Sequence, residues 1–428
     1  MDRNARTEIM NWLTTAGLTG LAEIELLRGF CERCRTAGFE LSRGLVFIDT
    51  LHPIFEGRGF RWTDEEVSES DMFEYGSSSS GEGAANWQRS PFYAMLEQGH
   101  AEMRVDLERS HAYDFSMVGD LAAKGHKDCV LFIHRFGETE IIGEMDCVYS
   151  YWLMRDACGF DAVERLEALR ELVPLLGLAV KACALTRVAR TLGHVYLGRD
   201  AAERVLHGRI SRGVADRINA VLWYSDLRGF TAISEAMPPA ELIPFLNDYA
   251  DAAIGAIHDA GGDVLKLIGD GVLAIFNPDD MVLARQEALR AENQLRKAIR
   301  DINQRRSGEN KLITTAYVSL HVGEVFYGNI GSDERLDFTV VGPAVNEVSR
   351  IGAMCNSVDR ELLVSSTFLA GLDPAGRDQF VSTGRFALRG IGRAQELFTL
   401  DPEIRTLAPR ADRYERYLGG AFDGDTGV

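Results

Sequence analysis

The chain has 428 residues, of which 46% are hydrophobic, so it is long enough for two or three domains with real cores. Its formal net charge of −18 argues against a nucleic-acid-binding protein and against a basic protein of the membrane surface, since both rely on clustered Lys and Arg. No run of about eighteen apolar residues occurs and no signal peptide is recognisable, so we expect no membrane span and a cytoplasmic location.

The first part of the chain mixes helical and strand patterns. Apolar residues recur at helical spacing between residues 9 and 30 and again over 161–197, where Pro174 should kink or divide the helix. Strands are predicted at 44–53, 129–136 and 144–154, and the Gly/Ser-rich stretch 74–87 predicts a mobile loop. Cys31 and Cys34 form a CxxC on a helical pattern without a second pair to complete a zinc site, so they are interpreted as two reduced thiols.

These elements predict an α+β domain over residues 1–184, in which helices flank an antiparallel sheet of four to six strands. The pattern is typical of a GAF- or PAS-like sensor and equally of folds that bind no ligand. A small molecule or a protein partner could act here, and a haem or metal sensor could use a histidine. A lone histidine is more often structural, however. The histidines in question are His52, His100, His111, His126 and His134.

The second part of the chain has a more regular order. After a helical linker over 185–218, the patterns predict a strand, a helix, a hairpin, a helix and further strands between residues 219 and 402, followed by a loose polar tail over 403–428. The predicted strands cover 220–226, the hairpin 265–276, two short strands within 315–331, then 336–342, 361–366 and 394–400; the helices cover 238–262, 281–306 and 343–355. This order predicts a ferredoxin-like βαββαβ domain, also α+β.

Three charged positions stand out in this second part. Asp226 ends an apolar strand, and Asp270 occupies the turn of the hairpin that should lie beside that strand. Two carboxylates converging near a backbone carbonyl make a hard-oxygen site for Mg²⁺, although Asp270 could simply serve its Asp-Gly turn and Asp226 could simply cap a strand. Lys266 sits among apolar residues of the same hairpin, where burying a charge without a partner is costly.

A further pair lies on the helix after residue 342. Asn346 and Arg350 are four residues apart and therefore share one helix face. Such a pair can bind phosphate and orient a hydroxyl group, although most pairs of this kind are only solvated surface.

The stretches "LWYSDLRGFTAISE", "GGDVLKLIGDGVLAIF" and "LDFTVVGPAVNEVSR" resemble the three successive core motifs of class III nucleotide cyclases, and the similarity covers about residues 185–400. The resemblance implies that Asp226 and Asp270 bind metal, with the Leu227 carbonyl as a further ligand. It also implies that Lys266 and Thr339 read the purine base.

The same resemblance implies that Asn346 positions the ribose, that Arg350 stabilises the transition state and that Arg389 contacts the terminal phosphates. Many members carry Asp where this chain has Thr339, whereas one subclass of bacterial adenylyl cyclases carries Thr or Ser. Lys with Thr favours ATP, because Lys266 would oppose the ring N–H donor of guanine. A preference for GTP or a pyrimidine triphosphate stays an alternative.

What the family implies about mechanism is specific. Two ions per site, Mg²⁺ or Mn²⁺, assist attack of the ribose 3′-OH on the α-phosphate, which yields 3′,5′-cyclic AMP and pyrophosphate. A homodimer shares its sites: one protomer supplies Asp226 and Asp270, and the other supplies Lys266, Thr339, Asn346 and Arg350. The N-terminal domain would regulate this activity.

A nucleotide-binding regulator without turnover stays a second alternative. A diguanylate-forming enzyme would need a Gly-Gly-acidic-Glu-Phe hairpin, which "IGDGV" is not.

Overall fold

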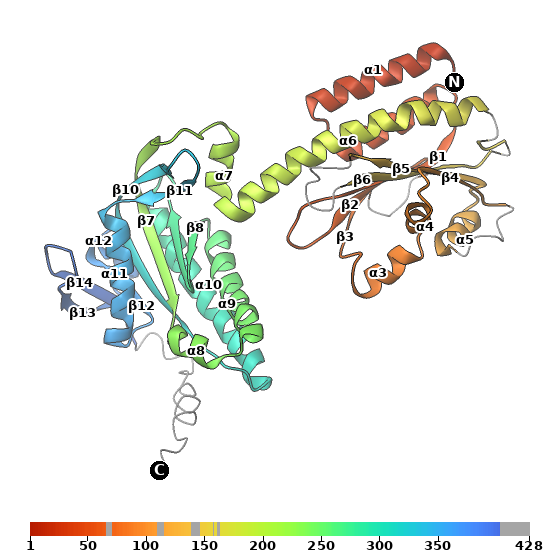
Figure 1. The fold of residues 1–428 in the computed structure, drawn as a ribbon. Helices are drawn as coiled ribbons and strands as arrows, with labels where there is room; N and C mark the ends of the chain where they lie inside the picture. The colour runs from red at the N-terminus through yellow and green to blue at the C-terminus, as the bar shows by residue number, and fades with distance from the viewer. Residues whose placement is uncertain (66–70, 109–114, 138–145, 157, 161–162, 403–428) are drawn as a thin grey trace. The chain divides into compact units, whose positions relative to one another are not determined.

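A computed structural model describes residues 1–65, 71–108, 115–137, 146–156, 158–160 and 163–402. The predicted tail 403–428 and His111 lie outside these described residues. The chain divides into two compact units, residues 1–192 and residues 193–428, and each unit has its own sheet. Figure 1 shows both units in one colour scale along the chain.

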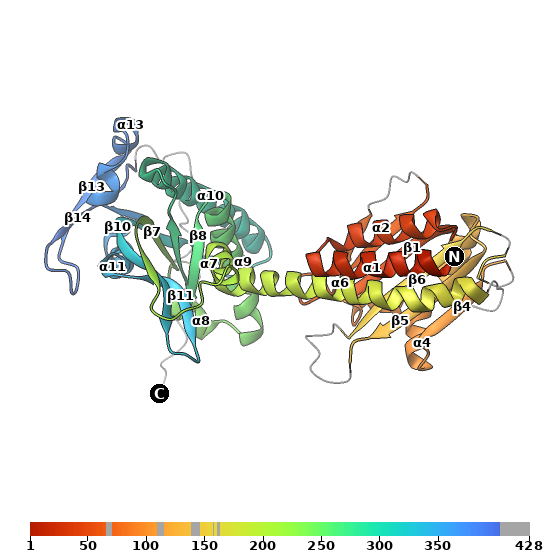
Figure 2. The ribbon, with the colours of Figure 1, turned by 90° about the horizontal axis from the view of Figure 1, so that it is seen from above.

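Unit 1 is built on a six-stranded sheet in which every pair of neighbours is antiparallel. The strand order is β3 (Met72–Tyr75), β2 (Gly57–Thr63), β1 (Leu41–Asp49), β6 (Cys147–Met154), β5 (Asp128–Arg135) and β4 (Glu102–Asp106). One face is covered by α1 (Arg3–Thr19), α2 (Glu23–Thr36) and α6 (Val163–Leu197), which lie side by side in Figure 2. The other face is covered by α3 (Gly81–Gln88), α4 (Pro91–Glu97) and α5 (Ser116–Ala123). The predicted antiparallel α+β domain is confirmed.

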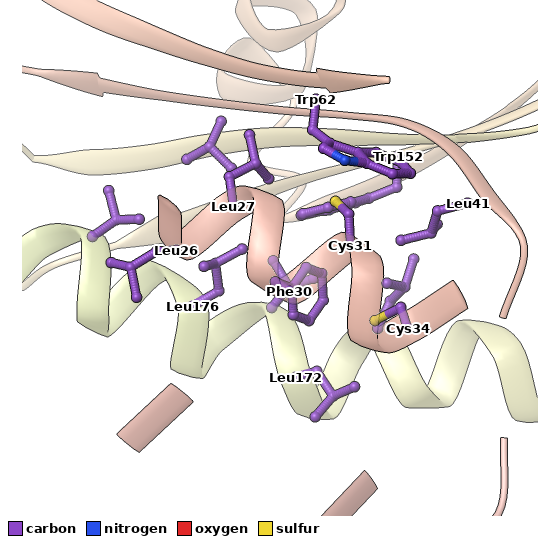
Figure 3. Close-up of a cluster of buried hydrophobic side chains, with 14 of the residues drawn as sticks. Leu26, Leu27, Phe30, Cys31, Cys34, Leu41, Trp62, Trp152, Leu172 and Leu176 are labelled. Atoms are coloured by element: carbon purple, nitrogen blue, oxygen red, sulfur yellow. The ribbon is translucent and has the colours of Figure 1, made fainter. Parts of the chain in front are cut away.

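The two cysteines of the CxxC lie in the core under α2. Cys31 and Cys34 point into the same cluster as Phe30, and the α6 residues Leu172 and Leu176 close it from the other side (Figure 3). Both thiols are free and fully buried, and burial raises their pKa values well above the ordinary value of a thiol. The two cysteines therefore pack as small apolar core residues, and their predicted place on a helix is confirmed by α2.

Two local predictions in unit 1 are wrong. Residues 81–88 form α3, although the stretch 74–87 was expected to be a loop. The expectation that Pro174 divides the helix is wrong as well, because α6 is one helix of 35 residues with Pro174 inside it, whereas the alternative, a kink at Pro174, stays a prediction. Val173 and Leu176, on either side of Pro174, are buried, and this packing offsets the roughly 3 kcal/mol that an interior proline costs a helix.

α6 is also the one helix among the described residues that is long and apolar enough to cross a membrane, over Glu164–Leu197. Length and composition alone are weak grounds for a span, because core helices of soluble proteins have the same properties. Leu169, Leu172 and Val180 of this helix belong to the unit 1 core. The absence of a membrane span therefore stays a prediction.

Unit 2 carries an eight-stranded sheet. Its order is β13 (Phe380–Phe386), β14 (Gln395–Leu400), β12 (Leu362–Ser365), β10 (Ala316–Gly331), β7 (Ala215–Leu227), β9 (Gly271–Phe276) and β8 (Asp263–Ile268), with β11 (Leu336–Val341) also paired to β10. The segment β7-α9-β8-β9-α10-β10, with the order β10-β7-β9-β8, has the predicted ferredoxin-like arrangement. α9 (Pro239–Asp259) and α10 (Met281–Gly308) cover one face, whereas α7 (Arg199–Leu206) and α11 (Pro343–Val358) pack on the other. Three short helices complete the unit: α8 (Phe230–Ala236), α12 (Ser366–Ala370) and α13 (Pro374–Arg377).

Two strands differ from the prediction. β10 is a single strand of 16 residues, whereas two short strands were expected within 315–331. Glycines inside it allow close approach: a Cβ on Gly323 would come 2.5 Å from the Cβ of Ala344, and one on Gly328 would come 2.2 Å from the carbonyl oxygen of Val214. β13 was not predicted; none of its residues 380–386 is buried, and they show little apolar alternation.

Candidate active site

The two predicted metal-binding carboxylates meet at one edge of the unit 2 sheet. β7 ends at Leu227, and its neighbour β9 begins at Gly271, so the β8–β9 turn lies beside the end of β7. Gly269 takes the left-handed conformation at this turn, with φ of 64°. Asp270 Oδ2 accepts a hydrogen bond of 3.0 Å from the Leu227 N–H, and the side chains of Asp226 and Asp270 share a hydrogen bond. The structure therefore brings Asp226, Leu227 and Asp270 together.

The electrostatics of this pair suit a divalent cation. Partial burial raises the pKa of Asp226 to about 7, and its hydrogen bond to Asp270 and the charge of Asp270 add to this effect. Burial and the same two carboxylates raise the pKa of the Tyr224 hydroxyl to about 12, so it keeps its proton at neutral pH. Two adjoining carboxylates repel each other when both are ionised, and a divalent cation held between them would remove that repulsion. The residues present therefore fit Mg²⁺ or Mn²⁺.

A cavity of about 180 Å³ opens beside the pair. Its walls are mainly apolar side chains of α9, α10 and the hairpin, among them Leu246, Ala250 and Leu295, and Asp226 and Asp270 lie at its edge. Side chains and metal ions held here would be partly shielded from water, which strengthens their electrostatic interactions.

Lys266 is not buried, which corrects the expectation that its charge lies in an apolar setting. Its side chain is 46% exposed and forms an ion pair with Asp337 of β11, whose side chain is 45% exposed. Asp337 and Thr339 are two residues apart on β11 and so point to the same face of that strand. The ion pair therefore brings Lys266 to the face of β11 that carries Thr339, which is largely buried.

Asp337 is the residue that sequence reasoning missed. The only signal for it in the sequence is an acidic residue two positions before Thr339, at the start of the predicted strand 336–342. Its role becomes visible only once β8 and β11 are known to lie near each other, because residues 266 and 337 are 71 positions apart.

Asn346 and Arg350 lie on α11, which begins after Gly342 with Pro343 in its first turn. Both side chains are exposed, and neither makes a hydrogen bond or an ion pair with another residue of the described part of the chain. The opposite face of α11 is fixed to the sheet: Ser319 Oγ donates to the carbonyl oxygens of Val348, at 2.8 Å, and Tyr224, at 3.2 Å.

Arg389 lies in an exposed turn after β13. The preceding residue, Leu388, packs in a small core with Ile351 of α11, which follows Arg350. This packing places the turn beside the part of α11 that carries Arg350. Within the described residues, no hydrogen bond or ion pair connects Asn346, Arg350 or Arg389 to the carboxylate pair.

Two of the described histidines of unit 1 have partners other than histidine. His126 is buried and bonded to Ser42 Oγ at 2.9 Å, while His52 stacks on Phe55 with ring centroids 3.6 Å apart. In the part of the chain that the structure describes, no group of three or more His, Cys, Asp or Glu side chains could hold a metal ion. The carboxylate pair of unit 2 offers two side chains and would need backbone or nucleotide oxygens to complete a metal site.

Residues 215–401 match the family model described as the adenylate and guanylate cyclase catalytic domain. An adenylate cyclase of Anabaena cylindrica is 33% identical over 164 residues, which are 38% of this chain and 32% of the relative. The terminal-differentiation specific adenylate cyclase of Dictyostelium discoideum is 30% identical over 160 residues, which are 37% of this chain and 7% of the relative. The crystal structure of the adenylyl cyclase CyaB from P. aeruginosa is 22% identical, with a TM-score of 0.41, and the match covers 46% of this chain and 98% of that one.

The matches to these two curated relatives thus span a third of one and less than a tenth of the other.

Proposed function

We propose that this chain, whose residues 215–401 form an adenylate and guanylate cyclase catalytic domain, converts ATP to 3′,5′-cyclic AMP and pyrophosphate. The observation that carries the proposal is the meeting of Asp226 and Asp270 at the end of β7. The two residues are 44 positions apart in the chain, yet the fold brings them together at a sheet edge beside a cavity. This arrangement supports a metal-dependent site.

Lys266 and Thr339 support ATP as the substrate. The Lys266 ammonium can donate to a ring nitrogen of adenine, whereas guanine presents an N–H donor at that position. The Thr339 hydroxyl can accept a hydrogen bond from the adenine amino group. Asp337 pairs with Lys266 and holds its side chain on the side of β11 that carries Thr339. The ion pair therefore favours an ammonium group that points toward the base beside Thr339. GTP or a pyrimidine triphosphate is the alternative substrate.

The proposed site is shared between two copies of the chain. In a homodimer, Asp226 and Asp270 of one protomer would face Lys266, Asn346 and Arg350 of its partner, which gives two equivalent sites. Large apolar side chains on the hairpin and on the β10–β11 pair support an interface there. They are Leu267 (53% exposed), Ile268 (49%), Phe326 (49%) and Val341 (44%).

Each group of residues has a chemical task in this proposal. Asp226, Asp270 and the Leu227 carbonyl would hold two divalent ions, which when bound lower the pKa of the ribose 3′-OH and neutralise charge on the phosphates. Asn346 orients the ribose so that the 3′-OH lies in line with the α-phosphate. The Arg350 guanidinium offsets the charge that develops on the equatorial oxygens, and Arg389 binds the terminal phosphates.

We further propose that unit 1 is a GAF- or PAS-like regulatory domain of a cytoplasmic enzyme, acting through a small-molecule ligand or a protein partner. Its six antiparallel strands, covered by helices on both faces, support a sensor fold. α6 is a candidate for carrying the signal, because it runs without a break from unit 1 into the start of unit 2.

Incubation of the purified chain with each of the four ribonucleoside triphosphates and Mg²⁺ or Mn²⁺, with identification of the product by mass spectrometry, tests the proposal. Cyclic AMP from ATP is the expected product, and Asp226→Ala should abolish it while the chain stays folded. A cyclic product from another nucleotide alone would replace ATP as substrate. Tight ATP binding without any product would favour the alternative, a nucleotide-binding regulator.

A further inference from the structure

Tyr224 lies on the same cross-strand row as Lys266. On β7 it is paired with Leu273 of β9, and Leu273 is paired in turn with Lys266 of β8. Directly paired residues point to the same face of a sheet, so the three side chains form one row on one face. With neighbouring strands about 4.8 Å apart, the Cα atoms of Tyr224 and Lys266 are about 10 Å apart. β8 has a bulge between Val264 and Lys266, next to this pair.

Two glycines make room for the Tyr224 ring. A Cβ on Gly352 of α11 would come 2.8 Å from Cδ1 of Tyr224, and a Cβ on Gly271 would come 3.2 Å from its hydroxyl oxygen. The ring is therefore held between α11, which carries Asn346 and Arg350, and the hairpin turn, which carries Asp270. Its position is set by packing on both sides, as expected for a group with a fixed task.

The hydroxyl group of Tyr224 makes no hydrogen bond with any other residue of the described part of the chain, and the residue is only half-buried. Two tyrosine hydroxyls of this unit are engaged, whereas that of Tyr327 is buried without a partner in the described residues. Tyr249 donates to Asn303 at 2.6 Å, and Tyr317 donates to Asn356 at 3.1 Å. Tyrosine hydroxyls usually find a partner when their ring is packed in this way. The Tyr224 hydroxyl is thus a donor and acceptor that the chain itself leaves available.

We propose that the Tyr224 hydroxyl contacts the nucleoside part of the bound nucleotide, on the row of Lys266, and is a further substrate-binding residue. This inference rests on the proposed function. The nucleoside is favoured over the phosphates because Tyr224 shares its row with the base-reading Lys266 and its ring packs beside the apolar Leu273. A nucleoside beside a fixed aromatic ring gains apolar contact as well as the hydrogen bond.

Tyr224→Phe tests the proposal, because it removes the hydroxyl and keeps the ring between its two glycines. Loss of one neutral hydrogen bond predicts a rise of about three- to tenfold in KM and in the Kd for ATP, with kcat within about twofold of the wild type. The affinity for tripolyphosphate, which lacks the nucleoside, should not change. Tyr317→Phe is the matched control: it removes a hydroxyl of the same domain that is already bonded to Asn356, and it should leave both constants unchanged.

Three outcomes would overturn the inference. If Tyr224→Phe binds and cyclises ATP as the wild type does, the hydroxyl does not contact the substrate, and the proposed function is unaffected. If the affinity for tripolyphosphate falls as much as that for ATP, the contact is to the phosphates. If the wild type neither binds nor cyclises any nucleoside triphosphate, the proposed function fails and this inference fails with it.

Discussion

Replacing Asp226 by Asn should stabilise the metal-free protein at pH 8 while it destroys activity. The folded chain raises the pKa of Asp226 from 3.8 to about 7. As the pH rises through this window, the unfolded chain loses the Asp226 proton while the folded chain keeps it, so the folded state loses stability with rising pH. Asn carries no charge, so the variant escapes this loss.

The magnitude follows from the shift. A shift of the Asp226 pKa by about three units corresponds to at most about 4 kcal/mol in the free energy of unfolding. Because the carboxylate pair is partly exposed to solvent, the expected gain in the variant is about 1–2 kcal/mol. For a unit of this size, each kcal/mol raises the unfolding temperature by about 2–4 °C, so the gain is about 2–8 °C. Saturating Mn²⁺ should stabilise the wild type more than the variant, because the variant lacks one ligand.

Differential scanning calorimetry of the full chain in EDTA, at pH 8 and at pH 5, measures this effect. Asp251→Asn is the matched control, since Asp251 lies exposed on α9 and its replacement changes the net charge equally. Equal stability of Asp226→Asn and the wild type at pH 8 would refute the reasoning. So would a gain of the same size at pH 5, where Asp226 of the folded wild type is already protonated.

Three further predictions concern single side chains. Asp337→Asn should raise KM for ATP several-fold, because it frees the Lys266 side chain. It should change the free energy of unfolding by less than about 1 kcal/mol, because the ion pair is exposed. Unchanged steady-state kinetics would count against this prediction. Burial lowers the pKa of His126 to about 4, so the folded chain resists a protonation that the unfolded chain accepts. As the pH falls from 6.5 to 4, the free energy of unfolding of the wild type should therefore drop by about 1–3 kcal/mol relative to that of His126→Gln. An equal pH dependence of the two free energies of unfolding over that range would contradict this. Trp152→Ala, at the fully buried Trp152 of the unit 1 core, should cost about 3–5 kcal/mol in urea unfolding; a cost below about 1 kcal/mol would mean that this core is loosely packed.

Local patterns predicted most of unit 2 because its elements carry strong signals. The helix expected at 343–355 is α11, Pro343–Val358, and its proline start and apolar face are both visible in the sequence. The Asp-Gly pair places the hairpin turn, and the resulting β8 and β9 bring Asp270 to the end of β7, as expected.

The features that sequence reasoning missed depend on distant parts of the chain. Gly323 and Gly328 weaken the strand pattern, yet β10 stays continuous because α11 and the start of β7 approach it closely at those glycines. Pro174 is tolerated because the surrounding α6 residues are buried in the unit 1 core. The partner of Lys266 was missed for the same reason: Asp337 is distant in sequence, and only the folded sheet places it nearby.

A mixing experiment tests the shared site most directly. Asp270→Ala and Arg350→Ala should each be inactive, because each removes an essential group from both sites of a homodimer. In an equal mixture, half of the dimers contain one chain of each kind, and each such dimer has one intact site, so about a quarter of the wild-type activity should return. No recovery, after exchange of subunits has been shown by mass spectrometry, would contradict a site built from the carboxylates of one chain and α11 of its partner.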